Sequence, residues 1–141
     1  MSKIHPKLYS EIVKKIPILC IDIIIIFEKK YLLVKRKENP LKNNWWVPGG
    51  RILLGETSLE AAKRKLDEEL NLKNFEDLKI YGIYEDFFKE SSFGKHLYQT
   101  HSIVFTIELE KKPLVKFDST ISEWKFDLNL PKRFLKKTKK F

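Results

Sequence analysis

The chain has 141 residues, of which 43% are apolar and 13% aromatic, so it can form a folded domain with a hydrophobic core. This composition excludes a disordered chain and the length excludes two domains of ordinary size, so we expect a single domain over residues 1–141. The formal net charge of +9 favours anionic partners. Much of the excess lies in the basic run 132–140, which is typical of a solvated helix end, so we do not expect a nucleic-acid partner.

The protein is expected to be cytoplasmic. Cys20 is the only cysteine, which excludes an intramolecular disulfide, and its apolar surroundings predict a packing role. The N-terminus lacks the apolar core of a signal peptide. The longest apolar run, 16–27, is too short to span a bilayer and contains Asp22, so no membrane partner is expected.

The first half of the chain predicts a short helix followed by strands. Residues 5–15 have an amphipathic pattern, which Pro17 ends, and 18–27 is a β-branched run typical of a buried strand. A polar turn then leads to a second strand at 31–37, giving a hairpin, and the Asn- and Pro-rich segment 39–44 is a loop. WWVP forms a short strand, after which Gly49 and Gly50 are expected to turn the chain.

The second half predicts one central helix and further strands. Thr57 and Glu60 form a capping-box signature for a helix that runs to about Leu70, with a buried face of Leu59, Ala62, Leu66 and Leu70. Strands are expected at 78–88, at 99–110 and around Trp124, with a loop at 91–96 and a basic helix after Pro131. This order predicts an α/β fold, an α/β/α sandwich around a mixed sheet.

The stretch from Gly49 to Glu69 carries the chemistry. Glycine allows the backbone to approach a ligand closely, and its carbonyl can join an oxygen coordination shell. Magnesium in proteins takes a few carboxylates, carbonyls, waters and substrate phosphates. Glu56, Glu68 and Glu69 would repel one another near this loop unless a cation intervened, and Arg64 can offset part of their charge. Taken alone, Glu68 and Glu69 are more typical of a solvated acidic helix face with ordinary i,i+4 pairs than of a metal site.

The full spacing of this stretch resembles the Nudix box, G-x5-E-x7-R-E-U-x-E-E-x-G-U, where U is a bulky apolar residue. Gly50, Glu56, Arg64, Glu68 and Glu69 fit the pattern. Lys65 stands where the box has glutamate and Asn71 where it has glycine. Asparagine tolerates the left-handed conformation at a helix end, so the second change is mild. Lys65 adds a positive charge that disfavours binding of several magnesium ions.

A closer resemblance covers residues 8–126. The segments KRKENPLKNNWWVPGGR, ILCIDIIII and YGIYEDFF are similar to the GDP-mannose mannosyl hydrolase branch of the Nudix superfamily. The resemblance implies one Mg²⁺ as cofactor and attack at the anomeric carbon of a nucleotide sugar, which releases GDP and the free hexose. A homodimer is also compatible with it.

The same resemblance implies the roles of individual residues. The carbonyl of Gly49 and the carboxylate of Glu69 would hold the metal with the substrate diphosphate, and Glu68 is a further candidate ligand. Arg36 and Arg51 would bind the diphosphate and stabilise the leaving group, and Asp22 would contact the substrate.

The catalytic base departs from the branch, which has a Gln-His pair before its last Trp-containing strand. Counting back from Trp124, these positions are Asp118 and Ser119. Asp118 can ligate the metal or act as the base, whereas serine cannot serve as a general base near neutral pH. Acids at positions 85, 86 and 90 are the alternatives for the base.

Three other functions remain open. Glu68 is compatible with pyrophosphohydrolase attack at phosphorus of a nucleoside diphosphate linked to another group. Lys65 and the missing histidine are compatible with a non-catalytic nucleotide-binding module. The basic tail is compatible with nucleic-acid binding.

Overall fold

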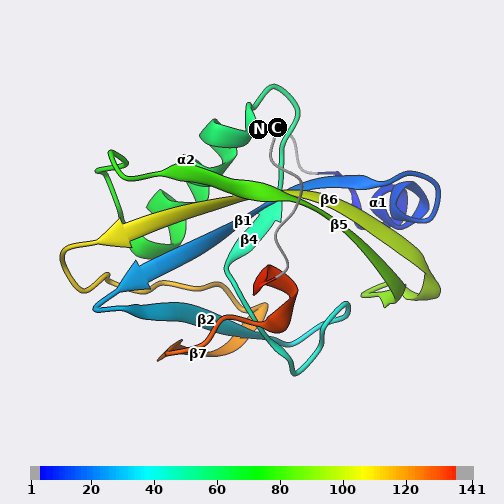
Figure 1. Ribbon diagram of the computed structural model, residues 1–141. Helices are drawn as coiled ribbons and strands as arrows, with labels where there is room; N and C mark the ends of the chain where they lie inside the picture. The colour runs from blue at the N-terminus through cyan, green and yellow to red at the C-terminus, as the bar shows by residue number, and fades with distance from the viewer. Residues whose placement is uncertain (1–3, 136–141) are drawn as a thin grey trace.

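The computed structural model describes residues 4–135, which form a seven-stranded mixed sheet with helical elements on both faces (Figure 1). In chain order the elements are α1 (Pro6–Val13), β1 (Ile18–Phe27), β2 (Lys30–Arg36), β3 (Trp45–Trp46), β4 (Gly49–Arg51), α2 (Ser58–Leu70), β5 (Lys79–Ser91), β6 (Gly94–Leu109), β7 (Ile121–Asp127) and the 3₁₀-helix η1 (Lys132–Leu135). The predicted α/β class with a mixed sheet is confirmed. Residues 136–141, which carry most of the basic tail, lie outside the described residues.

Strand β1 is the centre of the sheet and changes its antiparallel partner along its length. It runs parallel to β6 throughout, from Ile18 opposite Thr100 to Phe27 opposite Leu109. On its other side β1 pairs first with β4 and then, at its end, with β2. Strand β2 continues the sheet to β3 and β7, while β5 pairs with β6. The short strand β4 therefore occupies the place where β2 leaves β1.

Two hydrophobic cores lie on opposite faces of the sheet. One, beneath α2, contains Ile21, Ile23 and Ile25 of β1. The other contains Ile24 of β1 and Phe134 of η1. Successive side chains of a strand point to opposite faces, so a β1 that is apolar at nearly every position supplies both cores.

Helix α2 begins and ends as the sequence predicts, with one change on its buried face. The side chain of Thr57 accepts a hydrogen bond from the N–H of Glu60, and the Glu60 carboxylate accepts one from the N–H of Thr57. Asn71 ends the helix at φ 49°, in the left-handed conformation. Leu59 was expected to be buried and is 42% exposed, because the buried face is turned toward Ala61.

The prediction that Gly49 and Gly50 turn the chain is wrong, because both belong to the extended strand β4. The need for glycine at position 49 is instead steric. A Cβ there would lie 2.2 Å from Oδ1 of Asp22 and 2.4 Å from the backbone oxygen of Ile21. Gly49 thus allows β4 to approach β1 closely.

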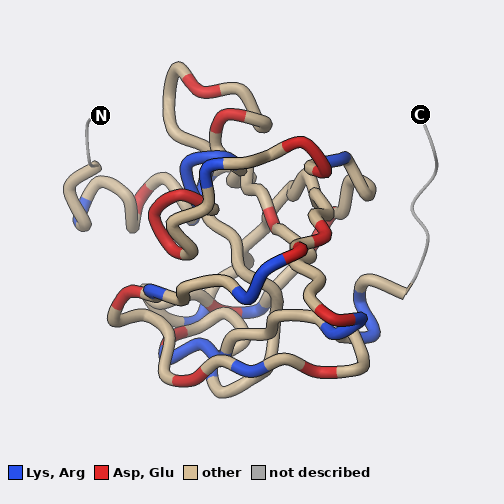
Figure 2. Tube along the Cα trace, turned by 90° about the vertical axis from the view of Figure 1, so that its left-hand side faces the viewer, with Lys and Arg blue, Asp and Glu red and all other residues tan. Residues whose placement is uncertain are grey.

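The described surface carries charges of both signs. Figure 2 shows basic and acidic segments interspersed along the trace of the described residues. No helix in residues 4–135 is long and apolar enough to cross a membrane.

Replacing Gly49 with alanine should destabilise the protein. The new Cβ would meet the Asp22 carboxylate and a backbone oxygen of β1. The backbone oxygen cannot yield without moving β1, and overpacking of this kind costs about 1–3 kcal/mol or more. Gly50→Ala is the matched control, because its Cβ meets only the flexible end of Lys65, at 3.3 Å from Cε. Urea denaturation of both variants measures the difference, and equal free energies of unfolding would contradict the steric role of Gly49.

Candidate active site

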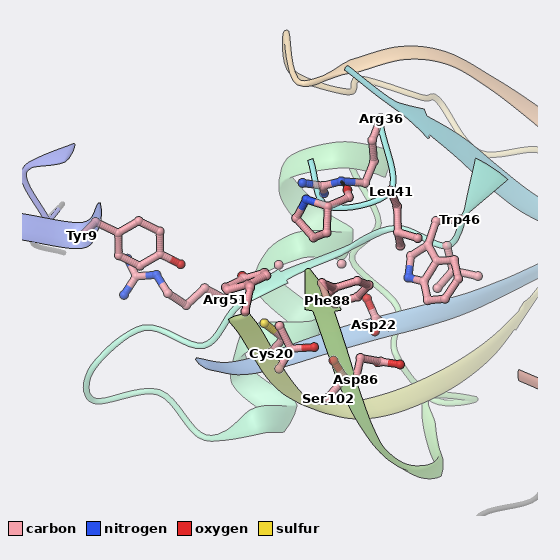
Figure 3. Close-up of a pocket in the computed structure, with 16 residues that line it drawn as sticks. Tyr9, Cys20, Asp22, Arg36, Leu41, Trp46, Arg51, Asp86, Phe88 and Ser102 are labelled. Carbon is pink, nitrogen blue, oxygen red and sulfur yellow. Dashed lines mark hydrogen bonds between the residues drawn. The ribbon is translucent and has the colours of Figure 1, made fainter. Parts of the chain in front are cut away.

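Two cavities meet at β4 and contain most of the residues that the sequence singles out. The larger, of about 260 Å³, is lined by Asp22, Arg36 and Arg51 (Figure 3). The smaller, of about 50 Å³, is lined by Lys65, Glu69 and Asp118. Both are also lined by Arg36, Val47 and Gly49. A third cavity, of about 340 Å³, follows α2 and the end of β6 and contains none of the predicted site residues.

The two arginines reach the larger cavity from different strands, and each has one anchoring contact. Arg36, at the end of β2, donates a hydrogen bond from Nε to the carbonyl of Pro40 at 2.9 Å. Arg51 belongs to β4, and its guanidinium lies 5.1 Å from the ring centroid of Tyr9 in α1. These contacts orient both side chains, and neither arginine has an acidic partner among the described salt bridges, so both remain available to an anionic ligand.

Acidic and polar side chains also line this cavity, among them Asp22, Asp86 and Ser102. Burial raises the pKa of Asp22 to about 7. A hydrogen bond with Ser102 opposes this rise, and the negative charge of Asp86 adds to it. Asp86 itself is paired with Arg133 of η1, which also donates to the carbonyl of Glu85 at 3.1 Å. Asp22 is therefore poised to change its protonation state near neutral pH.

The single cysteine also lines this cavity and is not activated there. Burial raises the pKa of Cys20 to about 12, and the charge of Asp22 acts in the same direction. The thiol stays protonated at neutral pH, and since the thiolate is the nucleophile, Cys20 is unsuited to nucleophilic catalysis.

The smaller cavity brings Glu69 and Asp118 together. The N–H of Lys116 donates to the carbonyl of Glu69 at 2.6 Å, which ties the segment before β7 to the end of α2. Burial raises the pKa of Glu69 despite the opposing charge of Lys65. Asp118 is partly desolvated, yet hydrogen bonds from Thr120 and the charges of Lys65 and Arg36 lower its pKa below its usual range. Asp118 is thus a carboxylate at neutral pH.

The acids of α2 are divided between two basic residues. Arg64 binds Glu56 at 2.6 Å and approaches Glu68 to 3.5 Å. Lys65 binds Glu69 at 2.6 Å. Glu68 is exposed and lines neither of the two cavities, whereas Glu69 lies inside the smaller one.

The chain offers oxygen ligands that fit one divalent metal ion. Two carboxylates, Glu69 and Asp118, share the small cavity with Gly49. No group of three His, Cys, Asp or Glu side chains suited to a metal occurs within residues 4–135. Magnesium commonly takes one or two carboxylates and completes its shell with carbonyls, waters and phosphates, so this set suits an ion that a phosphate-bearing substrate helps to bind.

Several lining residues escaped the sequence analysis. Thr100 and Ser102 face the larger cavity from β6, and strand alternation could have placed them there once the strand direction was known. His101 between them does not line it, and its Nε2 lies 2.9 Å from the Gln99 amide nitrogen. Tyr9 carries no local signal, because only the packing of α1 brings it beside β4. Among the alternative acids for the base, Asp86 lines the larger cavity, whereas Glu85 and Glu90 line neither site cavity.

Comparison with known proteins gives a consistent family. The family model described as NUDIX domain matches residues 18–140. The chain is 32% identical over 83 residues to the low-salt glycan biosynthesis protein Agl8 of Haloferax volcanii, covering 59% of this chain and 53% of that protein. It is 45% identical over 56 residues to an ADP-ribose pyrophosphatase of Methanocaldococcus jannaschii, covering 40% and 33% of the two chains. The chain thus spans about half or less of the length of these relatives.

The solved structures show the same fold. The MutT NUDIX hydrolase from Burkholderia pseudomallei superposes with a TM-score of 0.65 at 21% identity, covering 83% of this chain and 90% of that one. At this identity the likeness concerns the fold alone.

The raised pKa of Asp22 predicts a pH-dependent stability difference. Folded Asp22 holds its proton more tightly than in the unfolded chain, so its contribution to stability falls as pH rises from about 4 through 7. Asp22→Asn cannot ionise, so its stability relative to the unsubstituted protein should rise by roughly 2–3 kcal/mol between pH 5 and pH 8. Urea denaturation at both pH values measures this, and a difference that does not change with pH would contradict the raised pKa.

Proposed function

Because the chain belongs to the Nudix family, we propose that it hydrolyses a nucleotide sugar resembling GDP-mannose and releases the nucleoside diphosphate and the free sugar. One observation carries this proposal. Arg36 and Arg51 line the same cavity as Asp22, directly beside the cavity that contains Glu69 and Asp118. The site thus combines two cations that can bind a diphosphate with an acid that can bind a sugar hydroxyl. Two carboxylates that can bind a metal lie beside them.

In the proposed reaction, water attacks the anomeric carbon and the bond from that carbon to the diphosphate oxygen breaks. The electron pair leaves with the diphosphate, whose negative charge therefore grows during the step. Arg36 and Arg51 bind this charge, and their contacts with Pro40 and Tyr9 orient them before substrate arrives. Oriented donors of this kind are each worth about 10²–10³ in rate.

The acids have two separate tasks. Asp22, with a pKa of about 7, is populated in both protonation states at neutral pH and can accept or donate a hydrogen bond to a sugar hydroxyl. Asp118 is ionised and can accept the proton of the attacking water or ligate the metal. Asp86 is the alternative base, although its carboxylate is held in an ion pair with Arg133.

We assign one Mg²⁺ to the carbonyl of Gly49 and the carboxylates of Glu69 and Asp118, together with substrate phosphate oxygens. When bound, the ion acts as a Lewis acid that neutralises charge on the departing diphosphate. The positive charge of Lys65 beside Glu69 disfavours a cluster of several ions, which supports attack at carbon rather than metal-assisted attack at phosphorus.

A second candidate function is pyrophosphohydrolase attack at phosphorus of a nucleoside diphosphate linked to another group. The 45% identity to an ADP-ribose pyrophosphatase over 56 residues favours it. The two candidates give different products from the same substrate.

Product analysis tests the function. The protein is incubated with Mg²⁺ and a panel of nucleotide sugars in ¹⁸O-water, and products are followed by phosphorus NMR and mass spectrometry. We expect nucleoside diphosphate and a free hexose that carries the label. Nucleoside monophosphate with sugar phosphate would establish the second candidate instead. Tight nucleotide-sugar binding without any product would show a non-catalytic module.

Glu69→Gln should abolish metal-dependent turnover without preventing folding, although it leaves the Lys65 ammonium without its carboxylate and so lowers stability. The amide keeps the shape of the side chain but removes the charge that attracts the metal, so kcat should fall by about 10² or more. Asp67→Asn is the matched control, because this carboxylate lies on the same helix, is exposed and pairs with Lys73. Steady-state kinetics at saturating Mg²⁺ measures the effect, and full activity of Glu69→Gln would overturn the metal assignment.

A further inference from the structure

The ion pair of Lys65 and Glu69 is shielded from solvent. Its Nζ–Oε1 distance is 2.6 Å, and the two side chains are 14% and 13% exposed. The other described ion pairs of α2, such as Lys73 with Asp67, involve more exposed groups or belong to the Arg64 network. Removing one partner of a shielded pair leaves a poorly solvated charge, so each of these two groups stabilises the charged form of the other.

The stem of the Lys65 side chain packs beside β4. Its stem passes beside Gly50 of β4, where an added Cβ would lie 3.3 Å from Cε and 3.6 Å from Nζ. The ammonium therefore lies against β4 in the smaller cavity, which Glu69 and Asp118 also line. The larger cavity offers Arg36 and Arg51 to an anion, and it meets the smaller one at Arg36 and Gly49, which line both.

A metal ion bound to Glu69 would have to share that carboxylate with the ammonium. Two cations on one shielded carboxylate repel each other, and the repulsion is stronger here than in water because the site is only slightly exposed. A diphosphate anion relieves it, since it can accept the ammonium and provide oxygens for the metal at the same time. Binding of the diphosphate therefore favours binding of the metal, and binding of the metal favours binding of the diphosphate.

We propose that Lys65 is an internal counter-ion for the metal-binding carboxylates, which makes divalent metal bind weakly to the protein alone and tightly only together with the diphosphate of the substrate. This inference rests on the proposed function in one respect, the identity of the anion. When metal and diphosphate bind together, the Lys65 ammonium would leave Glu69 for the diphosphate, and the metal would take its place on the carboxylate. By linkage, metal must then tighten diphosphate binding by the same factor as diphosphate tightens metal binding.

Titration with Mn²⁺ alone, followed by electron paramagnetic resonance, tests the first half of the proposal. Lys65→Met removes the charge and keeps the stem, and it should bind Mn²⁺ at least tenfold more tightly than the unsubstituted protein. Lys65→Glu adds a ligand in place of a competitor and should bind more tightly still. Lys63→Met is the matched control, because Lys63 lies on the same helix with its ammonium 5.7 Å from the ring centroid of Phe75, and its affinity should be unchanged. Equal affinity of Lys65→Met and the unsubstituted protein would overturn the proposal.

A measurement on the unsubstituted protein covers the case in which a Lys65 variant fails to fold. The dissociation constant of GDP is measured by calorimetry with and without Mn²⁺. We expect at least tenfold tighter GDP binding with metal, and GDP binding that ignores metal would overturn the proposal. The Mn²⁺ titration uses no substrate and no turnover. Its result is therefore independent of the product analysis. Equal Mn²⁺ affinities would overturn the role of Lys65 even if the products show attack at carbon, and tighter binding by Lys65→Met would support that role even if they show attack at phosphorus.

Discussion

The close approach of β4 to β1 determines the arrangement of this site. Gly49 lies opposite Asp22, and no side chain fits between the two strands at that point. The approach holds β4 where β2 departs from β1, so that a cavity opens on each side of the short strand. Arg51 follows Gly49 in the same strand, while α2 packs against the core that contains Ile21 and Ile23 of β1. Displacing β4 would separate the arginines, Asp22 and the acids of α2 together.

Charge balance on α2 is the second constraint. Arg64 holds Glu56 and Glu68 outside the cavities, while Lys65 holds Glu69 inside one of them. An acid-rich helix end of this kind would repel itself without such partners. The partner of Glu69 is the Lys65 side chain. The affinity of the Glu69 carboxylate for metal therefore depends on whether the Lys65 ammonium stays paired with it. Lys65, which stands where the usual pattern has glutamate, is thus the residue on which the proposed reaction of this family member depends.

Much of the fold follows from local patterns. The β-branched run predicts β1, and Thr57 with Glu60 predicts the start of α2, because a capping box satisfies backbone groups without help from distant residues. Local sequence patterns gave wrong predictions where contact with another element of the fold determines the role of a residue. Glycines suggest a turn when read alone, whereas here Gly49 is required by contact with another strand. Leu59 fits an apolar stripe, yet the helix is turned so that Ala61 faces the core.

The sequence by itself determined the family pattern, the central helix and the set of charged residues from which a site can be built, since these depend on residue identity and spacing. Only the tertiary structure decided which of them meet. It brought Tyr9 to Arg51, enclosed Asp22 beside Asp86, and separated Glu68 from Glu69 although they adjoin in the chain. The reason is that burial and charge pairing act through space. They depend on strand order and helix rotation, which spacing along one chain does not specify.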